Sequence, residues 1–176
     1  PTLSSSDSTG MSRLRSYSRS MREVFEESIS VRFLASALAS YDTERTATKI
    51  RDWMVRKDYD HIGVRRDGIV VGYALRDQLT HGQLGDHLVA FEEDDVVSGQ
   101  MPMLEALERV RDRRRVFVSI IGEVSGIVTR SDVTKPPVRL WLFGLVMIFE
   151  MQISRLIRAR YPDDSWVPLL PHQQVK

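Results

Sequence analysis

The sequence predicts an α/β fold in which one small unit occurs twice. Ile50–Gln78 and Leu104–Asp132 share a pattern of apolar residues and glycines at a separation of 54 residues. Each copy begins with helical spacing and continues with two short alternating runs around a turn, which is typical of helix, strand, turn and strand. A half of this size buries too little surface to fold alone, so the two copies are expected to pack together.

Composition narrows the function classes. The chain has 176 residues, of which 42% are hydrophobic, enough for one compact domain or two small modules that share a core. A net charge of +1 gives no general attraction to nucleic acid or anionic lipid. Without cysteine there are no disulfides and no cysteine-bearing metal sites. The first twenty residues lack the apolar stretch of a secretory signal, and we expect a cytoplasmic protein.

The N-terminal part divides in two. Residues 1–20 are rich in serine and predict a disordered arm. Residues 21–41 predict an amphipathic helix, because apolar residues recur at steps of three and four. These apolar residues are Val24, Phe25, Ile29, Phe33, Leu34, Ala37 and Leu38.

The first repeat is predicted over residues 42–85. It contains a helix at Thr46–Lys57 and strands at His61–Arg65 and Ile69–Leu75. Asp67-Gly68 predicts the tight turn between these strands. A second short helix is expected from Asp77 toward Thr80.

The second repeat is predicted over residues 86–160, including a long C-terminal helix. A short strand at Asp95–Ser98 precedes a helix at Met103–Arg113, and Gly122-Glu123 predicts the turn of the following hairpin. That hairpin joins strands at Val116–Ile121 and Val124–Thr129. The 54-residue register pairs the predicted core positions Ile50 and Trp53 with Leu104 and Leu107, and it turns Met103, Leu104, Leu107 and Val110 inward.

The double proline Pro136-Pro137 precedes the long helix, predicted from Val138 to Arg160. Leu140–Phe149 is apolar on every side, but this run is shorter than the ~20 residues of a membrane span. We therefore expect this helix to be buried in the core and against a partner. Residues 161–176 predict an irregular tail.

The strongest local signal is the heptad Gly126–Asp132. Two apolar residues follow the glycine as a strand would, and Thr129 and Asp132 add a hydroxyl and a carboxylate at the strand end. Such an edge suits a ligand with a flat apolar part and a sugar-phosphate part. Alternatively, Asp132 or Thr134 caps the following helix.

This heptad, together with the duplication, resembles the ligand motif of the CBS (cystathionine-β-synthase-type) domain. The resemblance covers about residues 42–155 and indicates a stand-alone, bacterial-type CBS domain protein. It implies a tandem CBS pair with pseudo-twofold symmetry and flanking N- and C-terminal helices. The expected regulatory ligand is an adenine nucleotide (ATP, ADP or AMP) or S-adenosylmethionine.

In the family, the hydroxyl and the carboxylate of the motif hold ribose and phosphate, which assigns these roles to Thr129 and Asp132. Arg130 is expected to pair with phosphate. The resemblance places the whole ligand site at Val96, Val97, Ser98, Val118, Gly126, Ile127, Thr129, Arg130 and Asp132. The first repeat departs from the motif at Leu75 and Gln78, so at most one such ligand is expected per chain.

We find no nucleophile elbow, Walker loop or zinc-ligand spacing, and we predict neither catalysis nor a metal site. The basic run Arg111–Arg115 is interpreted as a solvated helix end or as a phosphate clamp. The predicted function is a non-catalytic sensor that binds an adenosyl ligand. We expect a homodimer that contacts a protein target through its flanking helices.

Neither nucleic acid nor a membrane is an expected partner. Three alternatives stay open: a ligand-free dimeric interaction scaffold, the cytosolic regulatory part of a membrane protein, and a nucleic-acid binder that uses the arginine-serine arm and Arg111–Arg115.

Overall fold

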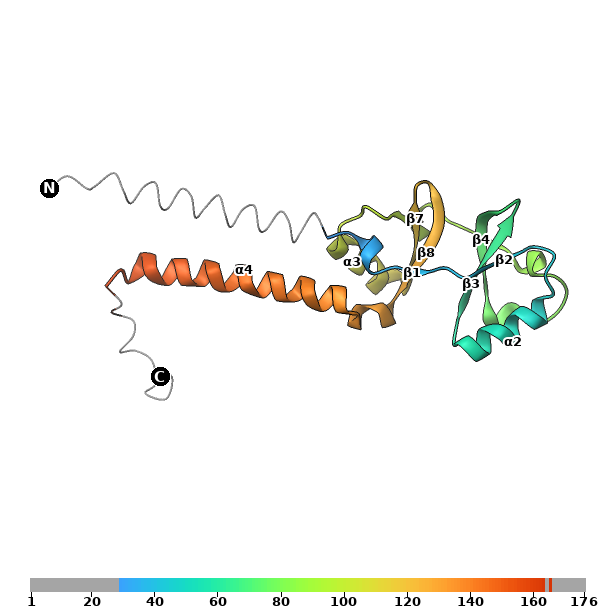
Figure 1. Ribbon diagram of the computed structural model, residues 1–176, viewed down its shortest axis with the longest axis horizontal. Helices are drawn as coiled ribbons and strands as arrows, with labels where there is room; N and C mark the ends of the chain where they lie inside the picture. The colour runs from blue at the N-terminus through green and yellow to red at the C-terminus, as the bar shows by residue number, and fades with distance from the viewer. Residues whose placement is uncertain (1–28, 164, 166–176) are drawn as a thin grey trace. The chain divides into compact units, whose positions relative to one another are not determined.

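The computed structural model describes residues 29–163 and Ser165, and the chain divides into two units (Figure 1). One unit is Ser30–Lys135, which holds both repeats. The described part of the other is the helix α4, Pro136–Arg160, with the few residues after it.

Each repeat has the predicted order of elements. Thr46 and Pro102 are the N-cap residues of two equivalent helices, α2 and α3, and each helix ends on a residue in the left-handed region. The first repeat comprises β2 (Ser40–Asp42), α2 (Ala47–Lys57), β3 (His61–Arg66), β4 (Ile69–Leu75) and the 3₁₀ turn η3 (Arg76–Gln78). The second comprises β6 (Val96–Ser98), α3 (Met103–Arg113), β7 (Arg115–Ile120), β8 (Glu123–Thr129) and η6 (Arg130–Thr134).

The two sheets are completed by strands from outside their own repeats. The orders are β2-β3-β4-β5 and β1-β8-β7-β6. The strand β1 (Ser36–Ala37) lies before the first repeat in the chain but pairs with β8 of the second. The linker supplies β5 (Val89–Ala90), after the turn η4 (Leu84–His87), to pair with β4. The predicted boundary at residue 85 therefore cuts off a strand of the first sheet.

The repeat has two registers, and the sequence showed only one. Strands repeat at 54 residues, as the β-bulges after Val64 and Val118 do. The helices repeat at 56 residues, because three residues join α2 to β3 and one joins α3 to β7. The predicted pairing of Ile50 and Trp53 with Leu104 and Leu107 is therefore wrong.

The helix cores confirm this offset. The buried residues of α2 are Ala47, Ile50 and Met54, and those of α3 are Met103, Ala106 and Val110. Leu104, predicted to face inward, is 47% exposed, and Leu107 is only partly buried.

The hairpin turns use two residues with positive φ, as a type I′ turn requires. These are Asp67-Gly68, as predicted, and Ile121-Gly122. The second turn lies one residue earlier than the predicted Gly122-Glu123. Ile121 has a φ of 54° and is 99% exposed, a costly backbone conformation for a β-branched residue.

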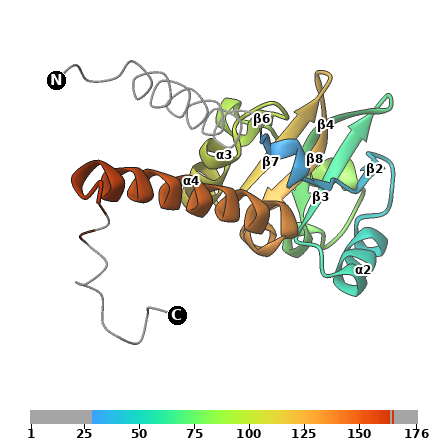
Figure 2. The ribbon, with the colours of Figure 1, turned by 60° about the vertical axis from the view of Figure 1, so that its left-hand side comes forward.

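The two hairpins pack against each other, and Figure 2 shows them adjacent. The cluster between the sheets centres on Leu38, Tyr73 and Phe117. A second cluster lies between α2 and the first sheet, around Met54, Ile62 and Leu84. The face-to-face arrangement of the two repeats is thus as predicted.

Two predictions outside the repeats are wrong. The helix predicted over residues 21–41 is absent from its described part, which forms the turn η2 (Val31–Phe33), β1 and the start of β2. The rest of that helix and the arm 1–20 lie outside the described residues, as does most of the tail 161–176. The helix α4 belongs to the other unit, so the second repeat ends at Lys135 and not at residue 160.

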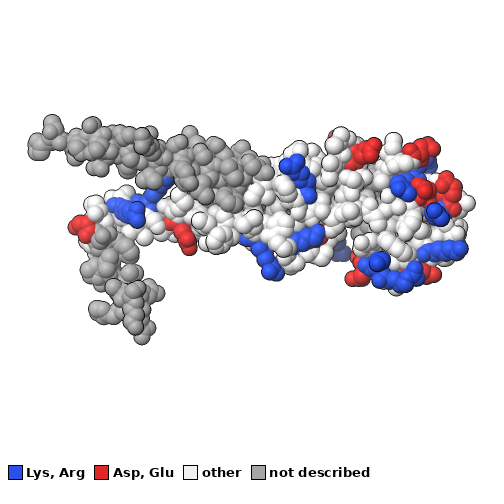
Figure 3. Space-filling model, in the orientation of Figure 1, with Lys and Arg blue, Asp and Glu red and all other residues white. Residues whose placement is uncertain are grey.

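The helix α4 carries few charges, and its visible surface in Figure 3 is mostly white. Within α4 the buried residues are Val138, Trp141, Gly144 and Ile148. The expected burial on several sides is therefore not found within the chain. Large side chains stay exposed along it: Leu140, Leu142, Phe143, Val146, Met147, Phe149, Ile153 and Leu156. By length and composition alone, it is the one helix among the described residues that could cross a membrane.

Candidate functional site

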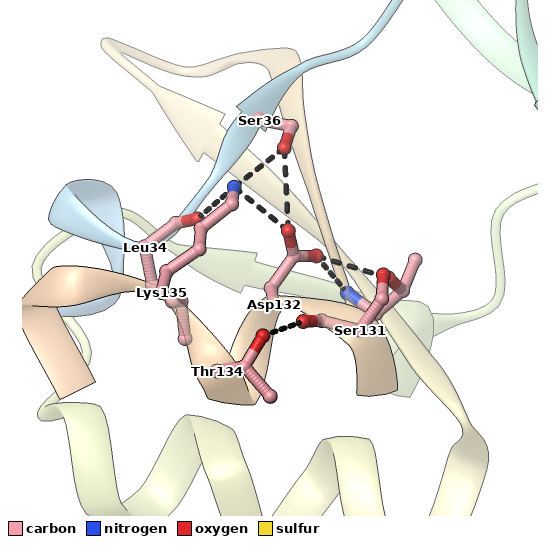
Figure 4. A network of polar contacts seen from close by, with 7 residues as sticks. Leu34, Ser36, Ser131, Asp132, Thr134 and Lys135 are labelled. Carbon is pink, nitrogen blue, oxygen red and sulfur yellow. Dashed lines mark hydrogen bonds and ion pairs between the residues drawn. The ribbon is translucent and has the colours of Figure 1, made fainter. Parts of the chain in front are cut away.

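The predicted heptad ends β8 and turns into η6. Thr129 is the N-cap residue of η6, and its backbone N–H donates to Asp132 Oδ2 over 2.6 Å. The Thr129 hydroxyl also donates to Asp132 Oδ2, at 3.0 Å. Asp132 is buried under the strand end by this capping box, and Lys135 pairs with its other oxygen at 2.7 Å (Figure 4). The alternative role of Asp132 as a cap is thus present in the structure.

A cavity of about 650 Å³ lies at this strand end, within the Ser30–Lys135 unit. Four predicted site residues line it: Ile127, Thr129, Arg130 and Asp132. The other five, Val96, Val97, Ser98, Val118 and Gly126, are not among its lining residues. The reason lies in the strand order, since β6 forms the sheet edge opposite β1. Val97 and Val118 are buried within that sheet instead.

Most of the remaining lining comes from segments that sequence reasoning did not assign to the site. They are Ser36–Ala39, which carries β1, the loop Asp58–His61 of the first repeat, Arg114 and Arg115 at the start of β7, and Ser131. The pairing of β1 with β8 has no local signature in the sequence. The basic run Arg111–Arg115 was the one available signal, and its last two residues reach the cavity.

Arginines dominate the free charge of the lining. Of the lining carboxylates, Asp60 pairs with Arg76 at 2.9 Å and Asp132 pairs with Lys135. Arg130 donates to the Arg111 carbonyl at 2.9 Å, so part of this guanidinium holds the end of α3. The Arg115 guanidinium stacks on the Tyr73 ring at 4.6 Å and donates to the Tyr73 hydroxyl. Its buried Nε has no hydrogen-bond partner in the part of the chain that the structure describes.

His61 lines the cavity next to these arginines. Burial and the nearby Arg115 lower the pKa of His61 to about 4. Its imidazole is therefore neutral at neutral pH and adds no charge to the cavity.

The equivalent position in the first repeat is filled. By strand register, Tyr73 corresponds to Ile127, and Phe91 corresponds to Leu38. The Phe117 ring packs 4.9 Å from Tyr73 and 4.8 Å from Phe91, measured between ring centroids. The residue that corresponds to Phe117 in the first repeat is Gly63, which presents no side chain to Leu38.

The sequence matches no family model and no curated protein. Solved structures do resemble it. One is the CBS-pair protein CBSX2 from Arabidopsis thaliana, which is 16% identical with a TM-score of 0.53 and covers 63% of this chain and 95% of that chain. CBSX2 in complex with AMP gives 19% identity and a TM-score of 0.54 over 63% of this chain and 97% of that chain.

A third resembling structure is the CBS domain of the bacterial CNNM/CorC family Mg²⁺ transporter in complex with ATP. It is 19% identical with a TM-score of 0.51 and covers 69% of this chain and 94% of that chain. At these identities the likeness is one of fold. The protein therefore has the fold of a tandem CBS pair, as its duplicated sequence predicted.

Proposed function

We propose that this protein is a non-catalytic regulatory module that binds an adenine nucleotide in the second-repeat cavity. One observation carries the proposal: Thr129 and Asp132 open onto the same cavity as Arg114 and Arg115. The motif thus supplies groups for a sugar where arginines are in reach of a phosphate. Structures of the same fold with AMP and with ATP support this proposal.

The cavity has the dimensions and the mixed chemistry of a nucleotide site. Its volume of about 650 Å³ lies within the common range of ligand pockets. Ala37, Leu38 and Ile127 offer an apolar wall for a flat base. The hydroxyls of Ser36 and Thr129 offer hydrogen bonds to a sugar.

The charges favour a phosphorylated ligand over S-adenosylmethionine. A sulfonium would lie among arginines, whereas phosphate oxygens would accept the unused N–H groups of Arg115. Guanidinium groups suit phosphate because their donors form a planar fork.

The ligand would act by joining the two repeats. Asp58–His61 belongs to the first repeat and Ile127–Asp132 to the second, and both line the cavity. Only a ligand that binds one arrangement of the repeats more tightly can shift their equilibrium. We place this sensor in the cytoplasm as a homodimer, with the exposed apolar side chains of α4 toward a protein partner.

Binding calorimetry of the whole chain with AMP, ADP, ATP and S-adenosylmethionine tests the proposal. We expect Arg115→Met and Thr129→Val each to weaken nucleotide binding about tenfold, since each removes hydrogen bonds to the ligand. Gln78→Ala, at the first-repeat position that corresponds to Asp132, should bind as tightly as the wild type. Equal affinity in all four proteins, or no binding to the wild type, contradicts the proposal.

A ligand-free interaction scaffold is the second candidate, and one observation favours it. The carboxylate of Asp132 is already held by Thr129 and Lys135, as in a purely structural cap. Thermal unfolding separates the two functions, because a bound nucleotide raises the midpoint in proportion to its concentration. No shift with millimolar nucleotide would favour the scaffold.

A further inference from the structure

Lys135 is the last residue before α4, and its ammonium group is fully engaged (Figure 4). It lies 2.7 Å from Asp132 Oδ1, and it donates to the Ser36 hydroxyl at 2.7 Å and to the Leu34 carbonyl at 3.0 Å. An ammonium has three donors, so all of them are used. Lys135 thereby joins β1, η6 and the start of α4 at one point.

The carboxylate of Asp132 is equally engaged. Thr129 donates twice to Oδ2, while Lys135 and the Ser36 hydroxyl, at 3.4 Å, contact Oδ1. A carboxylate has about four acceptor positions, so none is left for a ligand. A sugar hydroxyl that binds Asp132 must therefore replace one of these donors.

The two oxygens differ in how easily they exchange partners. The Thr129 N–H at Oδ2 belongs to the capping box, and its loss would open the first turn of η6. The donors at Oδ1 are side chains, and Lys135 and Ser36 also have each other as partners. Oδ1 is thus the oxygen that a ligand can take at the smaller cost.

We propose that Lys135 is a positioning residue that competes with the ligand's hydroxyl pair for Asp132. The ligand displaces the Lys135 ammonium from Oδ1 and so loosens the residue that immediately precedes α4. This inference rests on the proposed function, because it needs a ligand with neighbouring hydroxyls at Asp132. It gives the occupied state of the cavity a direct chemical consequence at the first residue of α4.

The lysine ammonium signals of the ¹⁵N-lysine-labelled whole chain, recorded by NMR, test this step. The sequence has only four lysines, and the signal that is missing in Lys135→Arg identifies Lys135. In the free protein we expect a slowly exchanging Lys135 signal that Asp132→Asn shifts. AMP should shift it as well, and 2′,3′-dideoxy-AMP, which lacks the hydroxyl pair, should leave it in place.

Affinities add a second readout. The ratio of AMP affinity to dideoxy-AMP affinity should rise about three- to tenfold in Lys135→Met, because the hydroxyls no longer displace a cation. Taking the ratio cancels the general effect of the lost charge on phosphate binding.

The outcomes separate the two proposals. If AMP binds the wild type but leaves the Lys135 signal and the affinity ratio unchanged, the competition is wrong and the nucleotide site stands. A Lys135 signal that does not respond to Asp132→Asn overturns the competition without any ligand. If the free-protein signals are as expected but neither AMP nor ATP binds, the proposed function fails, and the competition fails with it.

Discussion

The two clefts of the CBS pair occupy equivalent positions, yet one is filled and the other is open. The first-repeat cleft is closed by the rings of Tyr73, Phe91 and Phe117, which pack within 6 Å of one another. Across the pseudo-twofold axis the corresponding positions hold Ile127, Leu38 and Gly63, and a cavity of about 650 Å³ remains. A change in side-chain volume at three positions thus decides which half can hold a ligand, while the backbone topology stays the same.

The polar groups follow the same division. The open cleft has Thr129 and Asp132 at its strand end, and the closed one has Leu75 and Gln78. Arg115 serves both halves, because it stacks on Tyr73 of the closed cleft and lines the open one. The filled half is therefore a wall of the open half, and its packing should matter for both stability and binding.

The largest expected effect comes from emptying the closed cleft. Phe117→Ala should lower the free energy of unfolding by about 3–5 kcal/mol, because Phe117 is fully buried among aromatic rings. Phe117→Leu keeps more of the volume and should cost less than about 1.5 kcal/mol. Denaturant unfolding measures both. Equal small losses would mean that the aromatic cluster does not hold the repeats together.

Two equivalent glycines should respond differently to a methyl group. A Cβ on Gly72 would overlap the carbonyl oxygen of Val89, whereas on Gly126 the nearest atom would be Ala35 Cβ at 3.1 Å. We expect Gly72→Ala to cost about 2–3 kcal/mol and Gly126→Ala about 1 kcal/mol or less. Thermal unfolding of both variants checks this. The reverse order would show that β1 fits its sheet more tightly than β5.

The hairpin tips offer a gain in stability. Ile121→Asn should stabilise the protein by about 1 kcal/mol, because asparagine tolerates positive φ and the exposed isoleucine loses no buried contact. The matched change Asp67→Ile in the other hairpin should destabilise by a similar amount. A loss of stability in Ile121→Asn would mean that this tip packs against something in solution.

The smallest effect concerns pH. The folded pKa of His61, about 4, lies below its ordinary value near 6.5, so the unfolded chain binds a proton first as pH falls. The contribution of His61 is present above about pH 6.5 and is lost progressively between pH 6.5 and 4. With a discount for its partial exposure, we expect the thermal midpoint to fall about 3 °C across this window. His61→Gln should remove that part of the pH dependence, and an unchanged profile would contradict it.

The sequence predicted the fold well wherever the signal was local. Helix and strand bounds such as those of α3 and β4 follow from periodicity and turn residues, and the predicted pair of hairpins is present. The helix register was wrong because two extra residues between Lys57 and His61 leave the strand pattern undisturbed. The helix predicted through Phe33 failed because tertiary pairing of β1 with β8 overrides helical spacing.

The site was predicted in part for the same reason. Ile127, Thr129, Arg130 and Asp132 belong to one contiguous motif and lie together. The strand β6 was expected nearby, but its place is set by sheet order, which no short segment encodes. Ser36 and the loop Asp58–His61 reach the cavity only through long-range packing of the two repeats.

The exchange of β1 and β5 means that the duplicated stretch and the folding unit have different limits. A protease cut between Ala37 and Ser40 would strip the outermost strand from the later repeat, although it falls ahead of the earlier one. The bared edge of β8 would then invite pairing with another chain. Neither half can be excised as a working piece, and anything joined upstream of Ser36 is attached directly to the sheet that carries the open cleft.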